Sequence, residues 1–384
     1  MPSHTLHFPG NARIRTQLEH ALSAGRLAGS YLFEGAPGAG QEQAAIELAA
    51  GAIVGDTDLA NPDARRVRRY QHPDLLYVLP VLKPSGRSWQ DMPVEDIFDL
   101  FRAEQARKAE DPYAQPDFLK KPTIPVKALR ELLKLISTRP FEGRGRALIL
   151  RDADAMDSHG QDTLLKTLEE PPPGRVIVLI SSRPEALLPT VLSRCQRVPF
   201  DPLPASLLQS LLEDRGLAPA RAALLATLAD GSADLAVQLA AAEPSPDGDG
   251  DAGNPLLEQR EAWLDILEVC ELGSELQMLD AVQAFTRTGS RGNVTRERAE
   301  FLGLAQSWYR ELLGLAVGES EPRLFVDQRA RLTRLAGLTP AGLAERIQRC
   351  EKARAQILGN ANAQLTLLGL FFGFRQGALA RRAS

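Results

Sequence analysis

The stretch "GAPGAGQE" (35–42) follows an apolar run, "SYLFE", and precedes "QAAIELAAGAIV", a sequence rich in helix-forming residues. Gly35 and Gly40 have the spacing of a loop that binds phosphate, whose working form reads G-x-x-x-x-G-K-[ST]. The pattern therefore predicts a strand, a glycine loop and a helix in succession. In this chain, however, Gln41 occupies the lysine position and Glu42 occupies the position of the hydroxyl residue.

Composition restricts the class of protein. The chain has 384 residues, 44% of them apolar, and a formal net charge of −4, so we expect two or three domains and no overall basic surface for nucleic acid. The three cysteines, Cys195, Cys270 and Cys350, are far apart, which argues against a disulfide framework and suits a reducing compartment. The first residues have no apolar signal core, and no apolar run reaches the ~20 residues of a membrane span. We therefore expect a soluble, cytoplasmic protein with no membrane partner.

The first part of the chain alternates strand-like and helix-like segments, which predicts an α/β domain with a parallel sheet over residues 1–200. The segments expected to form strands are 30–34, 72–80, 147–150 and 176–180, and a helix is expected over 41–54. Residues 84–121 are polar, are flanked by prolines and contain one amphipathic stretch. We interpret them as an insertion into this domain.

The strand pattern ends near Asp201, and the rest of the chain is expected to be helical. Residues 201–241 predict a small helical lid domain. The segment "AEPSPDGDGDAGNP" (242–255) is acidic and rich in glycine and proline, which indicates a linker. Residues 256–384 predict an all-α domain, with Trp263 among its core positions.

A second departure from an active ATP site follows the strand at 147–150. A working site needs Asp-Glu directly after this strand to hold Mg²⁺, and the chain has Arg151-Asp152 instead. An arginine cannot ligate Mg²⁺, because its guanidinium has only donors. The glycine loop alone is also consistent with an ordinary turn. Two altered motifs on strands of one α/β unit favour a degenerate nucleotide site.

At this point the sequence resembles a known family. The stretch "HGQDTLLKTLEEPPPGRVIVLISSRPEALLPTVLSRCQRVPF" (159–200) is similar to the bacterial clamp-loader subunits of DNA polymerase III, above all to the delta-prime type. The resemblance covers residues 8–200, and "GNANAQLTLLGLFF" carries it at the C-terminal end. It implies a P-loop (RecA-like) AAA+ domain with a parallel sheet, a small helical lid and a helical collar domain that oligomerises.

The resemblance also assigns roles to individual residues. It implies that Gly35, Gly38 and Gly40 form a degenerate phosphate loop kept as architecture. In active relatives an arginine of the lid reaches the γ-phosphate, and the matching stretch "GSADLAV" has Asp234 there. The intact "SRC" motif implies that Arg194 is an arginine finger, a residue that one subunit supplies to the ATP site of its neighbour.

Together, Gln41, Glu42, Arg151 and Asp234 replace functional residues, whereas Asp152 is retained. The resemblance thus implies a non-catalytic subunit of a polymerase complex, with no cofactor of its own and with ATP bound by its partners. Those partners would be the motor (gamma/tau) and delta subunits, and through the complex the sliding clamp and primer-template DNA. Many relatives carry a four-cysteine zinc module, but residues 55–71 contain no cysteine, so neither zinc nor any other metal site is expected.

Two alternatives remain open. The chain could be an active motor-type clamp-loader ATPase, although the missing lysine and Asp-Glu pair argue against this reading. It could also be a binding module that uses the ATPase fold in another complex. Nucleotide-binding calorimetry separates the first alternative from the non-catalytic subunit, and copurification with a sliding clamp separates the second.

Overall fold

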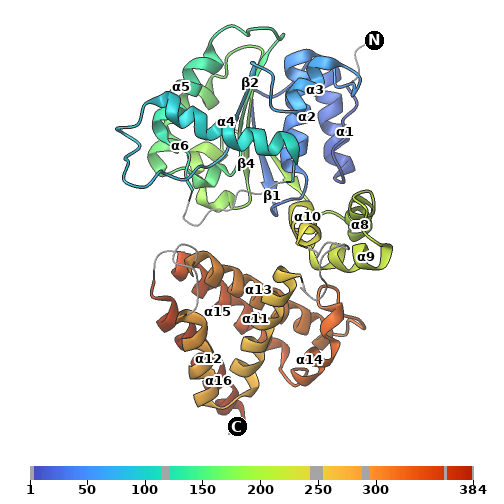
Figure 1. Ribbon diagram of the computed structural model, residues 1–384, viewed down its shortest axis with the longest axis vertical. Helices are drawn as coiled ribbons and strands as arrows, with labels where there is room; N and C mark the ends of the chain where they lie inside the picture. The colour runs from blue at the N-terminus through green and yellow to red at the C-terminus, as the bar shows by residue number, and fades with distance from the viewer. Residues whose placement is uncertain (1–3, 114–121, 243–253, 288–293, 359–360, 383–384) are drawn as a thin grey trace, which may run out of the picture. The chain divides into compact units, whose positions relative to one another are not determined.

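The computed structural model (Figure 1) describes residues 4–113, 122–242, 254–287, 294–358 and 361–382. The chain divides into two compact units, Met1–Ala240 and Ala241–Ser384. Most of the predicted linker lies outside the described residues, as does the end of the predicted insertion, residues 114–121.

A five-stranded sheet with the order β2-β3-β4-β1-β5 forms the centre of the first unit, and every described pair of neighbouring strands is parallel. Its strands are β1 (Ser30–Gly35), β2 (Leu75–Val78), β3 (Arg146–Leu150), β4 (Arg175–Ser181) and β5 (Gln196–Phe200). Strand β3 is buried along its whole length, as expected for the continuous apolar runs of a parallel sheet covered on both faces. The predicted α/β class with a parallel sheet is confirmed.

Helices cover both faces of this sheet (Figure 1). One face packs against α1 (Ala12–Ser23), α2 (Gln41–Val54) and α3 (Pro62–Arg68), and the other against α4 (Val94–Glu110), α5 (Val126–Ser137) and α6 (Ser158–Glu169). Successive side chains of a strand point to opposite faces, so Tyr31 and Phe33 join the first core whereas Leu32 joins the second. The carboxyl end of β1 thereby leads into α2, where the glycine loop lies.

The remaining helices of the first unit are short. Helix α7 (Pro189–Leu192) precedes β5, and three helices follow it: α8 (Ala205–Glu213), α9 (Pro219–Leu228) and α10 (Ala233–Ala241). Leu208, Leu212 and Leu225 are fully buried, and α8 and α9 pack against each other. We call these three helices the small helical group.

The described residues of the second unit form helices joined by loops. It consists of α11 (Pro255–Leu272), α12 (Glu275–Arg287), α13 (Val294–Ala316), α14 (Arg329–Arg334), α15 (Pro340–Leu358) and α16 (Ala363–Arg382). Trp263, predicted to be a core residue, is 9% exposed and packs edge-on against Phe301. Within the described part of the chain, no helix is long and apolar enough to cross a membrane.

Candidate functional site

The glycine loop bends as its sequence predicts. Gly35, Gly38 and Gly40 have φ angles of 150°, 76° and 97°, in the region that L-residues with a side chain rarely adopt. A Cβ at Gly38 would lie 2.4 Å from the Ser232 hydroxyl oxygen, so the loop can approach the small helical group only because it carries glycine there. Helix α2 begins at Gln41, directly after the last glycine.

Gln41 closes the loop on itself. Its side-chain Nε2 donates a hydrogen bond of 2.8 Å to the carbonyl oxygen of Ala36, and the residue is 4% exposed. A lysine at this position would extend toward a β/γ-phosphate. Here the neutral amide of Gln41 points back toward the loop and donates a hydrogen bond to one of its backbone carbonyls.

Glu42 is 7% exposed and forms the centre of a buried polar cluster. Its Oε1 accepts hydrogen bonds from the hydroxyls of Tyr70 (2.9 Å) and Tyr77 (2.6 Å). Its Oε2 pairs with Lys108 Nζ at 3.0 Å and with Arg151 Nε at 3.2 Å. A buried carboxylate is tolerated when it is paired and hydrogen-bonded, and Glu42 has two cations and two hydroxyls around it.

The protonation states follow from these contacts. Burial raises the pKa of Glu42, but Arg151 and Lys108 outweigh burial, so that the net pKa lies below its ordinary value. Burial lowers the pKa of Arg151, whereas Glu42 and other nearby acids raise it above its ordinary value. Burial, together with the Glu42 charge, raises the pKa of Tyr70 and Tyr77 well above 10.0. At neutral pH the tyrosines are therefore donors to an ionised carboxylate.

Asp234, at the start of α10, joins this cluster from the small helical group. Its Oδ2 lies 3.9 Å from Arg151 Nη2, and the backbone N–H of Ala233 donates to the carbonyl of Gly38 at 2.9 Å. Burial raises the pKa of Asp234 to about 6. Asp152 follows β3 with a left-handed φ of 49°, and its Oδ2 lies 3.8 Å from Arg151 Nε. The structure thus brings together the loop residues and the acids that the sequence singled out.

The hollow that these residues line measures about 40 Å³. On this measure one water needs about 10–15 Å³, and sites for small molecules usually measure about 300–1,000 Å³. In this conformation the hollow is therefore much smaller than a site for a nucleotide. Over the described ranges of the chain, no group of three or more His, Cys, Asp or Glu residues is placed to hold a metal ion.

Sequence reasoning missed Lys108, which lies on α4 within the predicted insertion. The residue is 1% exposed, although lysine is rarely buried without a partner. One signal was present in the sequence. Ile97 and Phe101 are buried on the same helix, and position 108 follows them at the spacing of one helix face. A lysine in that position indicates a buried acidic partner.

Arg194 lies elsewhere, between α7 and β5, and does not line the hollow. Its Nε donates a hydrogen bond to Glu169 Oε1 at 2.7 Å, and its Nη1 donates to the carbonyl of Thr190 at 2.8 Å. The side chain of Arg194 is 30% exposed, and that of Glu169 is 48% exposed. The guanidinium is thus held by its own chain at the surface.

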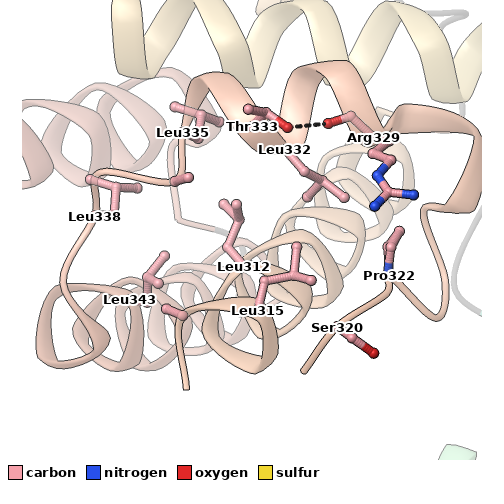
Figure 2. A pocket seen from close by; sticks show the side chains of 12 residues that line it. Leu312, Leu315, Ser320, Pro322, Arg329, Leu332, Thr333, Leu335, Leu338 and Leu343 are labelled. Carbon is pink, nitrogen blue, oxygen red and sulfur yellow. Dashed lines mark hydrogen bonds between the residues drawn. The ribbon is translucent and has the colours of Figure 1, made fainter. Parts of the chain in front are cut away.

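A larger hollow, of about 250 Å³, lies in the second unit (Figure 2). Leucines make up half of its lining residues, among them Leu312, Leu332 and Leu343, and Arg329 lies at its edge. Arg329 is the only ionisable residue in this lining, and it pairs with Glu321 at 3.2 Å. The lining therefore has no pair of groups for acid–base or nucleophilic chemistry.

The parallel sheet and the glycine loop between β1 and α2 define a domain with the P-loop fold. The sequence profile of the family described as DNA polymerase III, delta subunit, matches residues 10–204, just over half of the 384 residues. The chain belongs to this family of clamp-loader subunits of the DNA replication machinery.

The chain is also similar to individual subunits of DNA polymerase III. The chain is 29% identical over 231 residues to the DNA polymerase III subunit delta' of Bacillus subtilis, which covers 59% of this chain and 58% of that protein. It is 26% identical over 211 residues to the gamma/tau subunit of Mycobacterium tuberculosis, covering 55% of this chain and 31% of that protein. A solved gamma subunit-related protein of Thermotoga maritima matches at 18% identity with a TM-score of 0.38, over 94% of this chain and 99% of that one.

Proposed function

We propose that this chain is a non-catalytic, delta-prime-like subunit of a bacterial DNA polymerase III clamp loader. It would support the ATP-driven loading of the sliding clamp onto primed DNA. In the assembled loader, motor (gamma/tau) subunits would bind and hydrolyse ATP, and this chain would contribute Arg194 to the ATP site of a neighbouring motor. The helical second unit would serve as the collar through which it joins the motor and delta subunits.

The observation that carries this proposal is the state of the phosphate loop. Glu42 places a buried negative charge where a working loop has a hydroxyl for Mg²⁺, and the adjoining hollow measures about 40 Å³. A polyphosphate entering here would have to displace the Glu42 pairs with Lys108 and Arg151, and it would meet a second carboxylate at Asp234. Loss of its pairs would leave Glu42 without a cation in the interior. Both carboxylates would also repel the phosphates, since like charges repel strongly in a poorly solvated site.

The surroundings of Arg194 support the second part of the proposal. Exposed ion pairs contribute about 0–1 kcal/mol, so release of Arg194 from Glu169 costs little. A guanidinium at a helix–strand junction can then pair bidentately with phosphate oxygens of an adjacent subunit. An arginine supplied in this way stabilises the charge that develops on the transferred phosphoryl group.

Titration of the purified chain with MgATP in a calorimeter tests the non-catalytic assignment. We expect no binding heat and a steady-state rate of phosphate release equal to that of a buffer control. The variant Gln41→Lys/Glu42→Thr should also show no turnover, because Arg151 still occupies the metal position. Hydrolysis by the unmodified chain that is lost in Asp152→Ala would instead establish the motor-type ATPase.

Copurification from the host cell tests whether the chain is part of a clamp-loader complex. A clamp-loader subunit should be recovered with motor subunits, a delta subunit and the sliding clamp. Recovery in a stable complex that contains none of these proteins would favour the third reading, in which the ATPase fold serves as a binding module elsewhere.

A further inference from the structure

The segment interpreted as an insertion is anchored at both of its ends. Val81 and Thr123 pair as an isolated antiparallel bridge, with backbone hydrogen bonds of 2.9 and 3.1 Å. Within the segment, Ile97 and Phe101 of α4 are 0% and 2% exposed and belong to the core on that face of the sheet. Helix α4 is therefore part of the domain interior, and its position relative to the loop is fixed by packing.

The C-terminal half of α4 reaches the phosphate loop. Gln105 Nε2 donates to the carbonyl oxygen of Tyr77 at 2.7 Å, which ties α4 to the end region of β2. One turn further on, Lys108 Nζ donates to Glu42 Oε2 at 3.0 Å and to the carbonyl of Pro112 at 2.8 Å. The loop that lacks its own lysine thus receives an ammonium group from a segment 66 positions away in the sequence.

The residues that follow α4 contact the small helical group. Asp111 Oδ1 accepts a hydrogen bond from Arg215 Nη2 at 3.0 Å, and the same guanidinium lies 5.2 Å from the centroid of the Tyr113 ring. Arg215 lies two residues after the end of α8. Within about five residues, one segment therefore binds the phosphate loop through Lys108 and the small helical group through Asp111 and Tyr113.

We propose that residues 94–113 are a latch that holds the small helical group against the phosphate loop without nucleotide. A bound nucleotide would link a loop and a lid by contacting both, and here the chain makes that link with its own charges. The Gly38–Ala233 hydrogen bond and the Arg151–Asp234 pair also join the phosphate loop side to the small helical group. In this proposal they form together with the contacts of the latch. The inference rests on the proposed function only in that it takes this loop to be free of nucleotide.

Hydrogen–deuterium exchange of the full-length, nucleotide-free chain tests the latch. In Lys108→Met we expect the amides of residues 205–241 to exchange several-fold faster than in the unmodified chain, and the midpoint of thermal unfolding to fall by about 10 °C. Arg215→Ala removes only the exposed end of the latch. It should speed exchange in the same residues by about two- to fivefold and leave β3 and β4 unchanged.

Two further variants keep the test decisive. If Lys108→Met folds poorly, Glu42→Gln/Lys108→Met also removes the carboxylate that has lost one of its two cations. The double variant should recover at least half of the thermal shift, while residues 205–241 still exchange fast. Arg102→Ala is the matched control, because Arg102 lies on the same helix and, among the described residues, pairs locally with Asp99 at the surface. Arg102→Ala should change nothing in residues 205–241.

Unchanged exchange of residues 205–241 in both Arg215→Ala and the double variant would overturn the latch and leave Lys108 as a core residue alone. The same samples with MgATP separate this outcome from a failure of the proposed function. Protection of the loop by MgATP, or its hydrolysis, would refute the non-catalytic assignment. The exchange measured without nucleotide would still decide whether the latch exists.

Discussion

Arg151 and Arg194 both pair with a glutamate of the same domain, but their surroundings differ. The Arg151 side chain is 9% exposed and shares Glu42 with Lys108, whereas the side chains of Arg194 and Glu169 are 30% and 48% exposed. Loss of one partner from a buried pair leaves an uncompensated charge in the interior, while an exposed pair contributes about 0–1 kcal/mol. Arg151 is therefore held within its own chain, whereas Arg194 can leave Glu169 at little cost, as its proposed role in a neighbouring subunit requires.

The largest effect is expected from the replacement of Arg194. Arg194→Ala should leave the subunit folded and assembled, but it should lower hydrolysis at the neighbouring ATP site by about 10³-fold. Arg194→Lys should be nearly as damaging, because an ammonium group cannot pair bidentately with phosphate oxygens. The measurement is DNA- and clamp-stimulated phosphate release by the reconstituted complex, with assembly checked by gel filtration.

The loss for the whole complex should be smaller than the loss at the single site, because the other motor sites continue to turn over. Arg197→Ala is the matched control, since Arg197 is also a surface arginine paired with a glutamate, Glu34, at 2.7 Å. A reconstituted complex that contains Arg197→Ala should hydrolyse ATP normally. Normal hydrolysis and clamp loading by an intact Arg194→Ala complex would reduce Arg194 to an ordinary surface residue.

Replacement of Arg151 should destabilise the subunit and leave ATP hydrolysis unchanged, the reverse of the effect expected for Arg194. Arg151→Met should lower the free energy of unfolding by about 3 kcal/mol, because Glu42 loses one of its two buried cations. Hydrolysis per assembled complex should be unchanged. Urea unfolding of the isolated subunit measures the effect, and Arg194→Met should leave the unfolding midpoint within experimental error. Equal destabilisation by the two variants would contradict the contrast drawn from their burial.

Local patterns in the sequence predict most of the secondary structure of the α/β domain. The helix expected over 41–54 and the strands at 30–34, 147–150 and 176–180 all form, because each is an apolar run or a helix-forming stretch bounded by clear breakers. The strand expected over 72–80 is shorter, Leu75–Val78. Its flanks contain prolines, which cannot donate a hydrogen bond to a neighbouring strand.

The candidate site could be predicted only in part. The glycine loop, Gln41 and Arg151 follow from comparison with a motif, but the partners of Glu42 do not. Lys108 lies on a helix that matches no motif, and Tyr70 and Tyr77 are paired with Glu42 only through tertiary packing. Long-range side-chain contacts of this kind depend on how three elements meet, which no local pattern encodes. For this reason the sequence indicates only the loss of a hydroxyl residue at position 42, whereas the structure surrounds Glu42 with a stabilising network.

Asp234 gives a smaller effect with a defined pH dependence. Burial raises its pKa from an ordinary 3.8 to about 6, so the folded chain binds more protons than the unfolded chain between these two values. The free energy of unfolding therefore falls as the pH rises through this window, and it stays reduced above it. Asp234→Asn should stabilise the chain by about 2 kcal/mol at neutral pH. Thermal unfolding at several pH values should show the gain shrinking below pH 6, and a constant gain down to pH 4 would contradict this origin.

The smallest expected effect concerns the residue that holds Arg194. Glu169→Gln removes the charge that Arg194 must leave before it can reach another subunit, and an exposed pair of this kind contributes at most about 1 kcal/mol. The stability of the subunit should therefore hardly change, and hydrolysis at the neighbouring site should rise by at most about fivefold. Glu170→Gln is the control, because Glu170 is the adjacent exposed glutamate on the same helix end.

The dependence on ionic strength should differ between the Glu169→Gln and Arg151→Met variants. Salt screens exposed pairs and hardly affects buried ones, so the gain in Glu169→Gln should disappear at high salt, while the stability loss in Arg151→Met should persist. Phosphate release by the reconstituted complex and urea unfolding of the subunit, each at low and high salt, measure the two responses. A gain in Glu169→Gln that salt leaves intact would mean that Glu169 acts on the neighbouring site by some means other than its charge on Arg194.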